Sequence, residues 1–277
     1  EPSTNVKLEL SEHPSSKPGL AITPQGGVTI TEGSSADVQV ALLAKPDADV
    51  SVTFTVPAPY LASVTLTSPP ATTAPSPSLT LRFAPSTYDV SQTVTVANAK
   101  NDVAEGTRNL ALAIAVASIN VPFASLDPPA VPVTLVDTSS PGLVVSPSSN
   151  LAVSEGSAEG VVLSISLNTQ PTSPVTVSID EADDNGLPVE GASRGVSITP
   201  KSVSFSTSKW DEPLTTTVYG IADATALGDV LRQLAFVASS ADANYDAFRT
   251  AVGVMVIDID APGLVASKTS VVLGEGV

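Results

Sequence analysis

The chain has 277 residues, 42 % of them hydrophobic, and carries a formal net charge of −16 from 28 acidic and 12 basic residues. Because nucleic-acid binders neutralise phosphates with Lys and Arg, this balance argues against DNA and RNA as partners and against docking on an anionic membrane. The sequence has no cysteine and one histidine, which excludes disulfides, zinc ribbons and thiolate catalysis and leaves almost no route to a Ser-His-Asp triad.

Near its start, from Ser11, the chain has a Pro/Ser-rich stretch, SEHPSSKPG, in which we interpret His13 as a solvated linker residue. A sixteen-residue phrase follows: PGLAITPQGGVTITEG starts at Pro18, recurs as PGLVVSPSSNLAVSEG from Pro141, and begins again as PGLVASKTSVVLGEG from Pro262. A period of about 120 residues indicates a repeat array. We predict the tail of a preceding repeat over 1–17, full repeats over 18–140 and 141–261, and the start of a following repeat over 262–277. We therefore expect the chain to be a segment of a longer array.

Inside each repeat the apolar residues alternate with polar ones, as in VTIT, DVQVAL, VSVTFTV, LTLRF and QTVTVAN. This period of two, with many Val and Thr, is typical of half-buried antiparallel strands. The phrase itself is expected to form a first, kinked edge strand, and DVLRQLAFV to form a strand rather than a helix. About seven strands per repeat predict an all-β fold of tandem immunoglobulin-like β-sandwiches, with a closed barrel as the alternative. The short connectors DTSSPG and DAPG lead us to expect the sandwiches to stand end to end.

The two repeats align further inside, and the aligned stretches are LRFAPSTYDVSQTVTV over VSFSTSKWDEPLTTTV, EGTRNLALAI over LGDVLRQLAF, and VPVTLVD over VMVIDID. These alignments pair Tyr88 with Trp210 and Phe123 with Tyr245. Because only 4 % of the residues are aromatic, such recurrence predicts core or corner residues of the sandwich. The alternative is a sugar-stacking platform that includes Trp210.

One segment, TSPPATTAPSPS over residues 67–78, is an insertion that the second repeat lacks. Its composition favours an exposed polyproline-like loop. The alternative is that its Ser, Thr or Pro residues carry O-linked glycans.

The repeated VSEG, the F-x4-Y/W before TVTV, the loops NDVAEG and ADATALGD, and the closing VDTSSPG and DIDAPG resemble tandem Calx-β-like or cadherin-like surface repeats. The composition and the PSPS insertion are also similar to green-algal surface glycoproteins, including the immunoglobulin-like proteins of flagellar mastigonemes. The resemblance implies an extracellular or cell-surface location, on a flagellum or cell wall, and Ca²⁺ at a domain end.

Carboxylates from several loops must converge to give Ca²⁺ its six to eight oxygen ligands. The residues that match such a site in the first repeat are Glu32, Asn101, Asp102, Glu105 and Asp137, and in the second Glu155, Asp223, Asp229, Asp258 and Asp260. The alternative is that Glu32, Glu155 and Glu275 accept backbone N–H bonds in turns beside their glycines.

We predict a structural segment of a long extracellular filament or stalk, with other repeats of the chain, other copies or filament proteins as partners. The alternative is an adhesin-type module whose loops bind carbohydrate or protein, rigidified by Ca²⁺. The sequence argues against an enzyme, since only a carboxylate-pair chemistry survives the composition. Its densest acidic stretch, DEADDNG from Asp180, is interpreted as a solvated loop.

Overall fold

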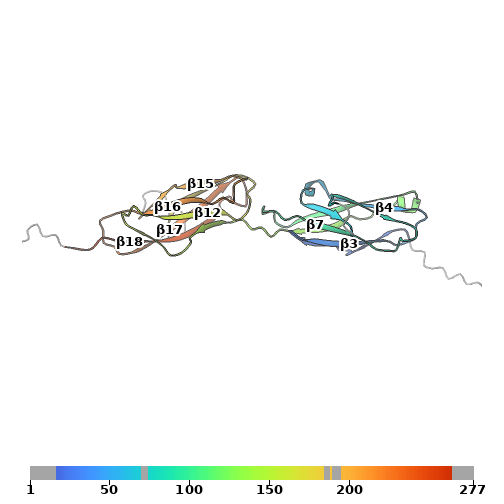
Figure 1. Ribbon diagram of the computed structural model, residues 1–277, viewed down its shortest axis with the longest axis horizontal. Helices are drawn as coiled ribbons and strands as arrows, with labels where there is room; N and C mark the ends of the chain where they lie inside the picture. Colours follow the sequence, from blue (N-terminus) through green and yellow to red (C-terminus); the bar gives the residue numbers. More distant parts are fainter. Residues whose placement is uncertain (1–16, 70–73, 184–187, 189–194, 264–277) are drawn as a thin grey trace, which may run out of the picture. The chain divides into compact units, whose positions relative to one another are not determined.

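The computed structural model describes residues 17–69, 74–183, 188 and 195–263. It divides into two compact units, Glu1–Ser139 and Ser140–Val277 (Figure 1). The predicted flanking repeat segments lie outside the described residues except for residue 17 and residues 262–263. His13 and Glu275 lie outside them as well.

The first unit is built of nine described strands, which Figure 1 colours from blue to green. Its elements are β1 (Leu20–Thr23), β2 (Val28–Thr31), β3 (Ser35–Leu42), β4 (Val50–Thr55), η1 (Ala58–Tyr60), β5 (Val64–Thr67), β6 (Ser78–Phe83), β7 (Gln92–Asn98), β8 (Arg108–Ser118), α1 (Val121–Ala124) and β9 (Val131–Val136).

The second unit also has nine described strands. These are β10 (Leu143–Ser146), β11 (Leu151–Ser154), β12 (Val161–Leu167), β13 (Val175–Ala182), β14 (Val196–Thr199), β15 (Ser202–Phe205), β16 (Leu214–Gly220), β17 (Val230–Ser240) and β18 (Arg249–Ile257). No helix among the described residues has the length and apolar character needed to cross a membrane.

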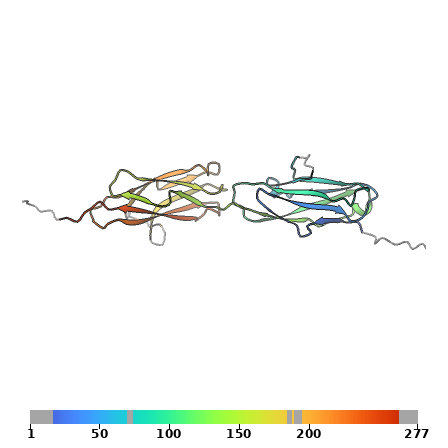
Figure 2. The ribbon, with the colours of Figure 1, turned by 60° about the horizontal axis from the view of Figure 1, so that its bottom comes forward.

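Each unit is a β-sandwich of one four-stranded and one five-stranded sheet (Figure 2). The strand orders are β1-β3-β7-β5 with β2-β9-β8-β4-β6, and β10-β12-β16-β14 with β11-β18-β17-β13-β15, so the two units share one topology. The pairing is not wholly antiparallel as expected, because β2 runs parallel to β9 and β11 parallel to β18. The fold class is therefore an all-β, immunoglobulin-like sandwich, with two more strands per unit than the alternation predicted.

One of the extra strands in each unit comes from the recurrent phrase, which forms two short strands instead of one kinked strand. In the second unit β10 pairs with β12 in the four-stranded sheet, whereas β11 pairs with β18 in the five-stranded sheet. Pro147 lies between them and has no N–H to give to a ladder, so the chain leaves one sheet there and joins the other. Both strands lie at sheet edges, as expected.

The core of each unit lies between its two sheets and is made of the apolar members of the alternating strands. In β4 the residues Val50, Val52 and Phe54 are fully buried, and the residues between them are only partly buried. Burying a Val, Leu or Phe side chain contributes roughly 1.5–3 kcal/mol, so the period of two is what assembles the two sheets. The stretch DVLRQLAFV falls in strand β17 apart from its first residue, which confirms that it is not helical.

The acidic stretch that begins at Asp180 is not a loop throughout. Asp180 and Glu181 belong to β13, and Glu181 is only 8 % exposed. The Nε atom of Arg232 on β17 lies 3.7 Å from Oε1 of Glu181. The strand continues through Ala182, which pairs with Gln233 of β17, and residues 184–187 of the stretch lie outside the described residues.

Candidate metal centre

The acidic residues of each unit gather at one end because two strands that pair in parallel finish there together. In the first unit Thr31 lies beside Val136, so Glu32 and Asp137 leave the sheet side by side. In the second unit Ser154 lies beside Ile257, which places Glu155 next to Asp258. The loop before β8 or β17 closes over the same end.

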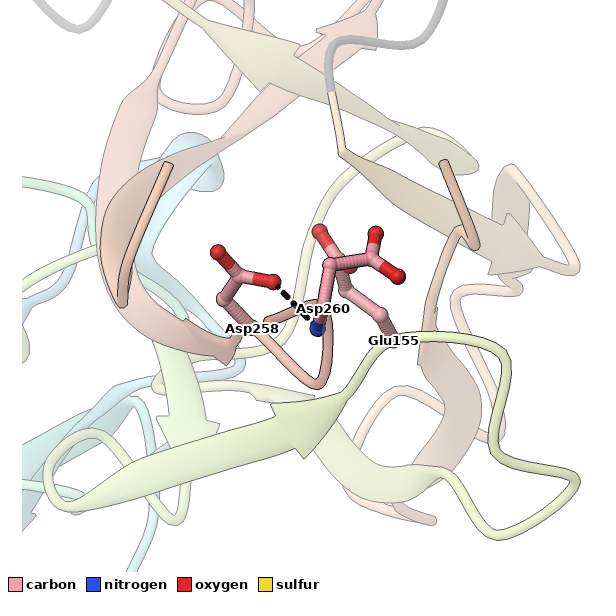
Figure 3. Close-up of side chains that lie close together, drawn as sticks. All are labelled: Glu155, Asp258 and Asp260. Atoms are coloured by element: carbon pink, nitrogen blue, oxygen red, sulfur yellow. Dashed lines mark hydrogen bonds between the residues drawn. The ribbon is translucent and has the colours of Figure 1, made fainter. Parts of the chain in front are cut away.

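In the second unit three carboxylates converge (Figure 3). One oxygen from each of Glu155, Asp258 and Asp260 lies within 4.8 Å of the others. Asp258 anchors the group: its Oδ1 accepts the N–H of Asp260 at 2.8 Å, and its Oδ2 accepts the N–H of Gly228 at 2.6 Å. Glu155 reaches the group from the turn after β11 and Asp260 from the chain that leaves β18.

This cluster concentrates negative charge. Burial raises the pKa of Glu155, and the charges of Asp223, Asp258 and Asp260 raise it further. The Oε2 atom of Glu155 is enclosed and has no hydrogen-bond partner among the described residues. By contrast, the N–H groups of Asp260 and Gly228 hold the pKa of Asp258 below its usual value. The arrangement therefore has one carboxylate secured by the backbone and another that lacks a compensating positive group.

Asp223 and Asp229 flank the cluster without joining it. Asp223 Oδ1 accepts the N–H of Thr225 at 2.6 Å, which shapes the loop before β17. Asp229 Oδ1 accepts the N–H of Asp258 at 3.1 Å, so it helps to fix the backbone of the residue that anchors the cluster. Both add to the negative charge at this end.

The corresponding acids of the first unit are hydrogen-bonded. Glu32 accepts the N–H of Asn101 at 2.6 Å on Oε1 and the hydroxyl of Thr138 at 3.1 Å on Oε2. Glu32 thus accepts a backbone N–H, as the alternative to a metal site predicted, but the donor Asn101 lies in the loop before β8 and not in the turn beside Gly33.

Asp137 is held by the backbone on both of its oxygens. Its Oδ2 accepts the N–H groups of Glu105 at 2.5 Å and Gly106 at 2.7 Å, and its Oδ1 accepts that of Ser139 at 2.8 Å. Burial pushes its pKa upward, but these three donors outweigh burial and lower it. This acid is therefore stabilised as the anion without a metal.

Glu105 lies at the same end, but its charge is paired. Its Oε2 is 2.6 Å from Nη2 of Arg108 and also accepts from Nδ2 of Asn101 at 3.2 Å. Asp102 is exposed and does not line the small crevice formed by Glu32, Glu105, Arg108 and Asp137 with their neighbours. Arg108 is a residue that the sequence analysis missed, and its signal was a basic residue three positions after a candidate ligand.

The hydrogen bonds also correct the alignment of the last strands. Asp137 accepts the N–H of Gly106 and Asp258 that of Gly228. Asp137 therefore corresponds to Asp258, and the alignment of VPVTLVD with VMVIDID was wrong by two residues. Asp260 then corresponds to Ser139, so the second unit has a carboxylate where the first has a hydroxyl.

The residues of the second unit fit a Ca²⁺ ion. Glu155, Asp258 and Asp260 offer up to six oxygens, and a carboxylate oxygen that accepts one N–H keeps a lone pair for a metal. The Oε2 atom of Glu155 has no hydrogen-bond partner among the described residues, and the negative charges of Asp223, Asp258 and Asp260 lie near this carboxyl. Those of the first unit fit less well, because backbone donors and a guanidinium already compensate their charges.

The recurrent aromatic residues belong to the cores. Phe123 and Tyr245 are fully buried, and Tyr88 and Trp210 are partly buried against the core of their own unit. The expectation of core or corner residues is confirmed.

A separate hollow of about 520 Å³ lies in the first unit between β1 and the segment 126–132. Its walls are mainly apolar and include Leu20, Ile22 and Leu43 on one side and Pro128 and Pro129 on the other.

No protein-family model matches the chain, and no curated protein matches it significantly. Solved structures match it at low identity. The periplasmic chaperone SfaE is 16 % identical over 45 % of this chain and 59 % of that chain, with a TM-score of 0.33. The calcium-binding domain CBD12 of CALX1.1 is 13 % identical over 79 % of each chain, with a TM-score of 0.31. Titin domains Z1Z2, in complex with telethonin, are 12 % identical over 88 % of this chain and 98 % of that one, with a TM-score of 0.37. At these identities and TM-scores the likeness concerns the fold alone.

Proposed function

We propose that the chain is a structural segment of an extracellular or cell-surface filament, built of successive β-sandwich repeats and acting by reach and lateral association. The observation that carries this proposal is the shared topology of the two units, with only six residues between the end of β9 at Val136 and the start of β10 at Leu143. A short connector of this kind cannot act as a long flexible coil. The sequence resemblance to surface repeats supports the extracellular location. In its most specific form, the proposal is that the filament is a mastigoneme of an algal flagellum.

Imaging of the native assembly by negative stain tests this proposal. A filament segment is expected to appear in fibres in which the sides of the sandwiches contact other copies or filament proteins. Discrete globular complexes that contact partners only through loop tips would contradict it. Intact mass of the native protein tests the accompanying proposal of O-linked glycans on residues 67–78.

Within this function, we propose that Ca²⁺ binds Glu155, Asp258 and Asp260 and fixes the end of the second unit. The ion would supply the positive charge that the enclosed Oε2 of Glu155 lacks. By cross-linking the turn after β11 to the exit of β18, it would stiffen the point where the chain leaves the unit. A stiffer exit from the unit would help a filament segment to keep its reach.

The alternative function is a binding module, and the apolar hollow beside β1 is the observation that favours it. Small-ligand sites are concave, and a hollow of about 520 Å³ has the size of such a site. Screening the chain on a carbohydrate array tests this alternative. Binding that Leu43→Asp or Ile22→Asp removes would favour the adhesin over the filament.

A further inference from the structure

The corresponding ends of the two units share one hydrogen-bonded framework but differ in positive charge. Gly106 and Gly228 donate to Asp137 and Asp258 in the same way. In the first unit a basic side chain, Arg108, lines the crevice at this end. Among the described residues of the second unit, no ion pair involves Glu155, Asp258 or Asp260.

The position of Arg108 is fixed by strand register. Arg108 lies opposite Leu135 at the start of β8, and Val230 lies opposite Val256 at the start of β17. Leu135 lies two residues before Asp137, and Val256 lies two residues before Asp258. Because Asp137 and Asp258 are equivalent, Val230 occupies in the second unit the position that Arg108 occupies in the first. Three residues before Arg108 the first unit has Glu105, and three residues before Val230 the second unit has Leu227. At these two positions the second unit therefore has neither the acid nor the basic partner that the first unit has.

The side chain of Arg108 is held in place from several directions. Its Nη2 contacts Glu105 Oε2 at 2.6 Å, and the two side chains are only 24 % and 29 % exposed. Its guanidinium carbon lies 5.7 Å from the centre of the Tyr60 ring, and the Tyr60 hydroxyl donates to the carbonyl of Asn109 at 2.8 Å. An arginine keeps its charge at every accessible pH, and a guanidinium beside a ring and a carboxylate has little freedom.

We propose that the guanidinium of Arg108 is the built-in cation of the first unit and performs there the charge compensation that Ca²⁺ performs in the second. This inference rests on the metal site proposed above for the second unit. The response of the chain to Ca²⁺ is then confined to the second unit, and residue 108 or 230 decides whether a unit needs the ion. The first unit keeps its end ordered at any Ca²⁺ concentration, whereas the second unit orders its end only where Ca²⁺ is plentiful.

Hydrogen exchange of the whole chain, with chelator or with millimolar Ca²⁺, reads both ends at once. The reporter amides are those that donate to the acids: Asn101, Glu105 and Gly106 in the first unit, and Gly228 and Asp260 in the second. In the unaltered chain, Ca²⁺ should slow exchange only at Gly228 and Asp260.

The variant Arg108→Val copies the residue of the second unit. In chelator it should speed exchange at the first unit's reporter amides by about tenfold, the loss expected for a charged hydrogen bond, and Ca²⁺ should restore their protection. Arg108→Lys keeps the charge and should stay close to the unaltered chain. The reciprocal Val230→Arg should remove the effect of Ca²⁺ on the second unit.

The outcomes separate the two proposals. If Ca²⁺ leaves the exchange of the Gly228 and Asp260 amides unchanged in the unaltered chain, the metal site proposed for the second unit is wrong. The proposal that Arg108 replaces Ca²⁺ in the first unit then fails with it. If those amides respond but Arg108→Val leaves the first unit unchanged in chelator, or Arg108→Lys behaves as Arg108→Val does, the role of Arg108 is overturned while the metal site stands.

Discussion

The backbone N–H of Gly228 donates to Oδ2 of Asp258 at 2.6 Å and ties the loop before β17 to the exit of β18. The same bond joins Gly106 to Asp137 in the first unit at 2.7 Å. Both glycines have positive φ, 78° and 67°, a conformation that glycine adopts without strain. The bond therefore marks equivalent points in the two units, and it identifies Asp260 as the carboxylate that the first unit replaces with Ser139.

Replacing Asp260 with serine should abolish the effect of Ca²⁺ on the second unit while leaving its fold intact. The serine is the residue that the first unit has there, and its backbone N–H can still donate to Asp258, so only a ligand is lost. Trp210, the single tryptophan, packs against the second core, so its fluorescence follows the unfolding of this unit alone. With Ca²⁺ at 100 times its Kd, the unaltered unit should gain about 2.7 kcal/mol, and Asp260→Ser close to none.

Asp229→Asn is the matched control for Asp260→Ser, because it lowers the charge by the same amount at a residue outside the cluster. A loss of the Ca²⁺ effect in both variants would mean that net charge, not coordination, produces the response. A response that survives Asp260→Ser would remove Asp260 from the site.

The stability of the second unit in chelator should depend on pH through Glu155. Because its pKa is raised in the folded unit, the folded state holds its proton more tightly than the unfolded chain does. Its ionised form therefore destabilises the unit at neutral pH, and this penalty is relieved as the pH falls through the raised pKa. Asp258 acts in the opposite sense: its pKa is lowered, so its stabilisation is present above its ordinary value and is lost as the pH falls through the lowered one.

Unfolding of Glu155→Gln, followed by Trp210 fluorescence, isolates this contribution from the many other carboxylates. In chelator the variant should be more stable than the unaltered chain at neutral pH, and the difference should shrink as the pH approaches the ordinary range of a glutamate. If the variant is less stable at neutral pH, Glu155 has a positive partner in solution, and the metal site loses its main support.

Much of the fold followed from the period of two and from the recurrence of the phrase. Alternation placed Val50, Val52 and Phe54 on the core side of one strand, and the recurrent aromatics placed Phe123 and Tyr245 in the cores. The change of sheet inside the phrase did not follow, because alternation is the same on both sides of Pro147. Parallel pairing of β11 with β18 is a contact between distant parts of the chain, and no local pattern encodes its direction.

The candidate site was predicted as a region more accurately than as a set of residues. Acids after β2, before β8 and after β9 were expected to share one end, and parallel pairing brings Glu32 to Asp137 and Glu155 to Asp258. The two-residue error in aligning the last strands arose because a shift of two preserves alternation. The pairing of Glu105 with Arg108 was not predicted, because acids alone suggest metal ligands and the cation three residues away was not weighed against them.

Tyr245→Phe should destabilise the second unit by about 1–3 kcal/mol, since it leaves buried polar groups without partners. The Tyr245 hydroxyl lies 3.0 Å from the N–H of Thr169 and 2.8 Å from its hydroxyl, and it donates to the carbonyl of Thr169 at 2.8 Å. Both residues are buried. Denaturant unfolding followed by Trp210 fluorescence measures the loss.

The first unit supplies the control for this prediction. Leu43 and Asn168 donate to Gly19 and Gly142 in the same way, so the next residue, Ala44, corresponds to Thr169, as Phe123 does to Tyr245. Adding Thr169→Ala to Tyr245→Phe removes the threonine hydroxyl as well and should cost less than the sum of the two single changes. Additive effects would mean that the two side chains do not interact in solution.

Replacing Ser68–Pro75 by Gly-Gly should leave the first unit folded, with a change in stability of about 1 kcal/mol or less, because loop-closure entropy varies slowly with loop length. The two bonds between Leu66 and Ser76 that close this loop, at 2.7 and 3.2 Å, would remain. The second unit joins the equivalent strands, β14 and β15, across only Pro200 and Lys201, so the topology tolerates a short link. Calorimetry of the whole chain measures the change.

If the first unit fails to fold, the insertion is part of its core. If the unit folds and the native protein loses more mass than the deleted residues account for, the insertion carries the glycans.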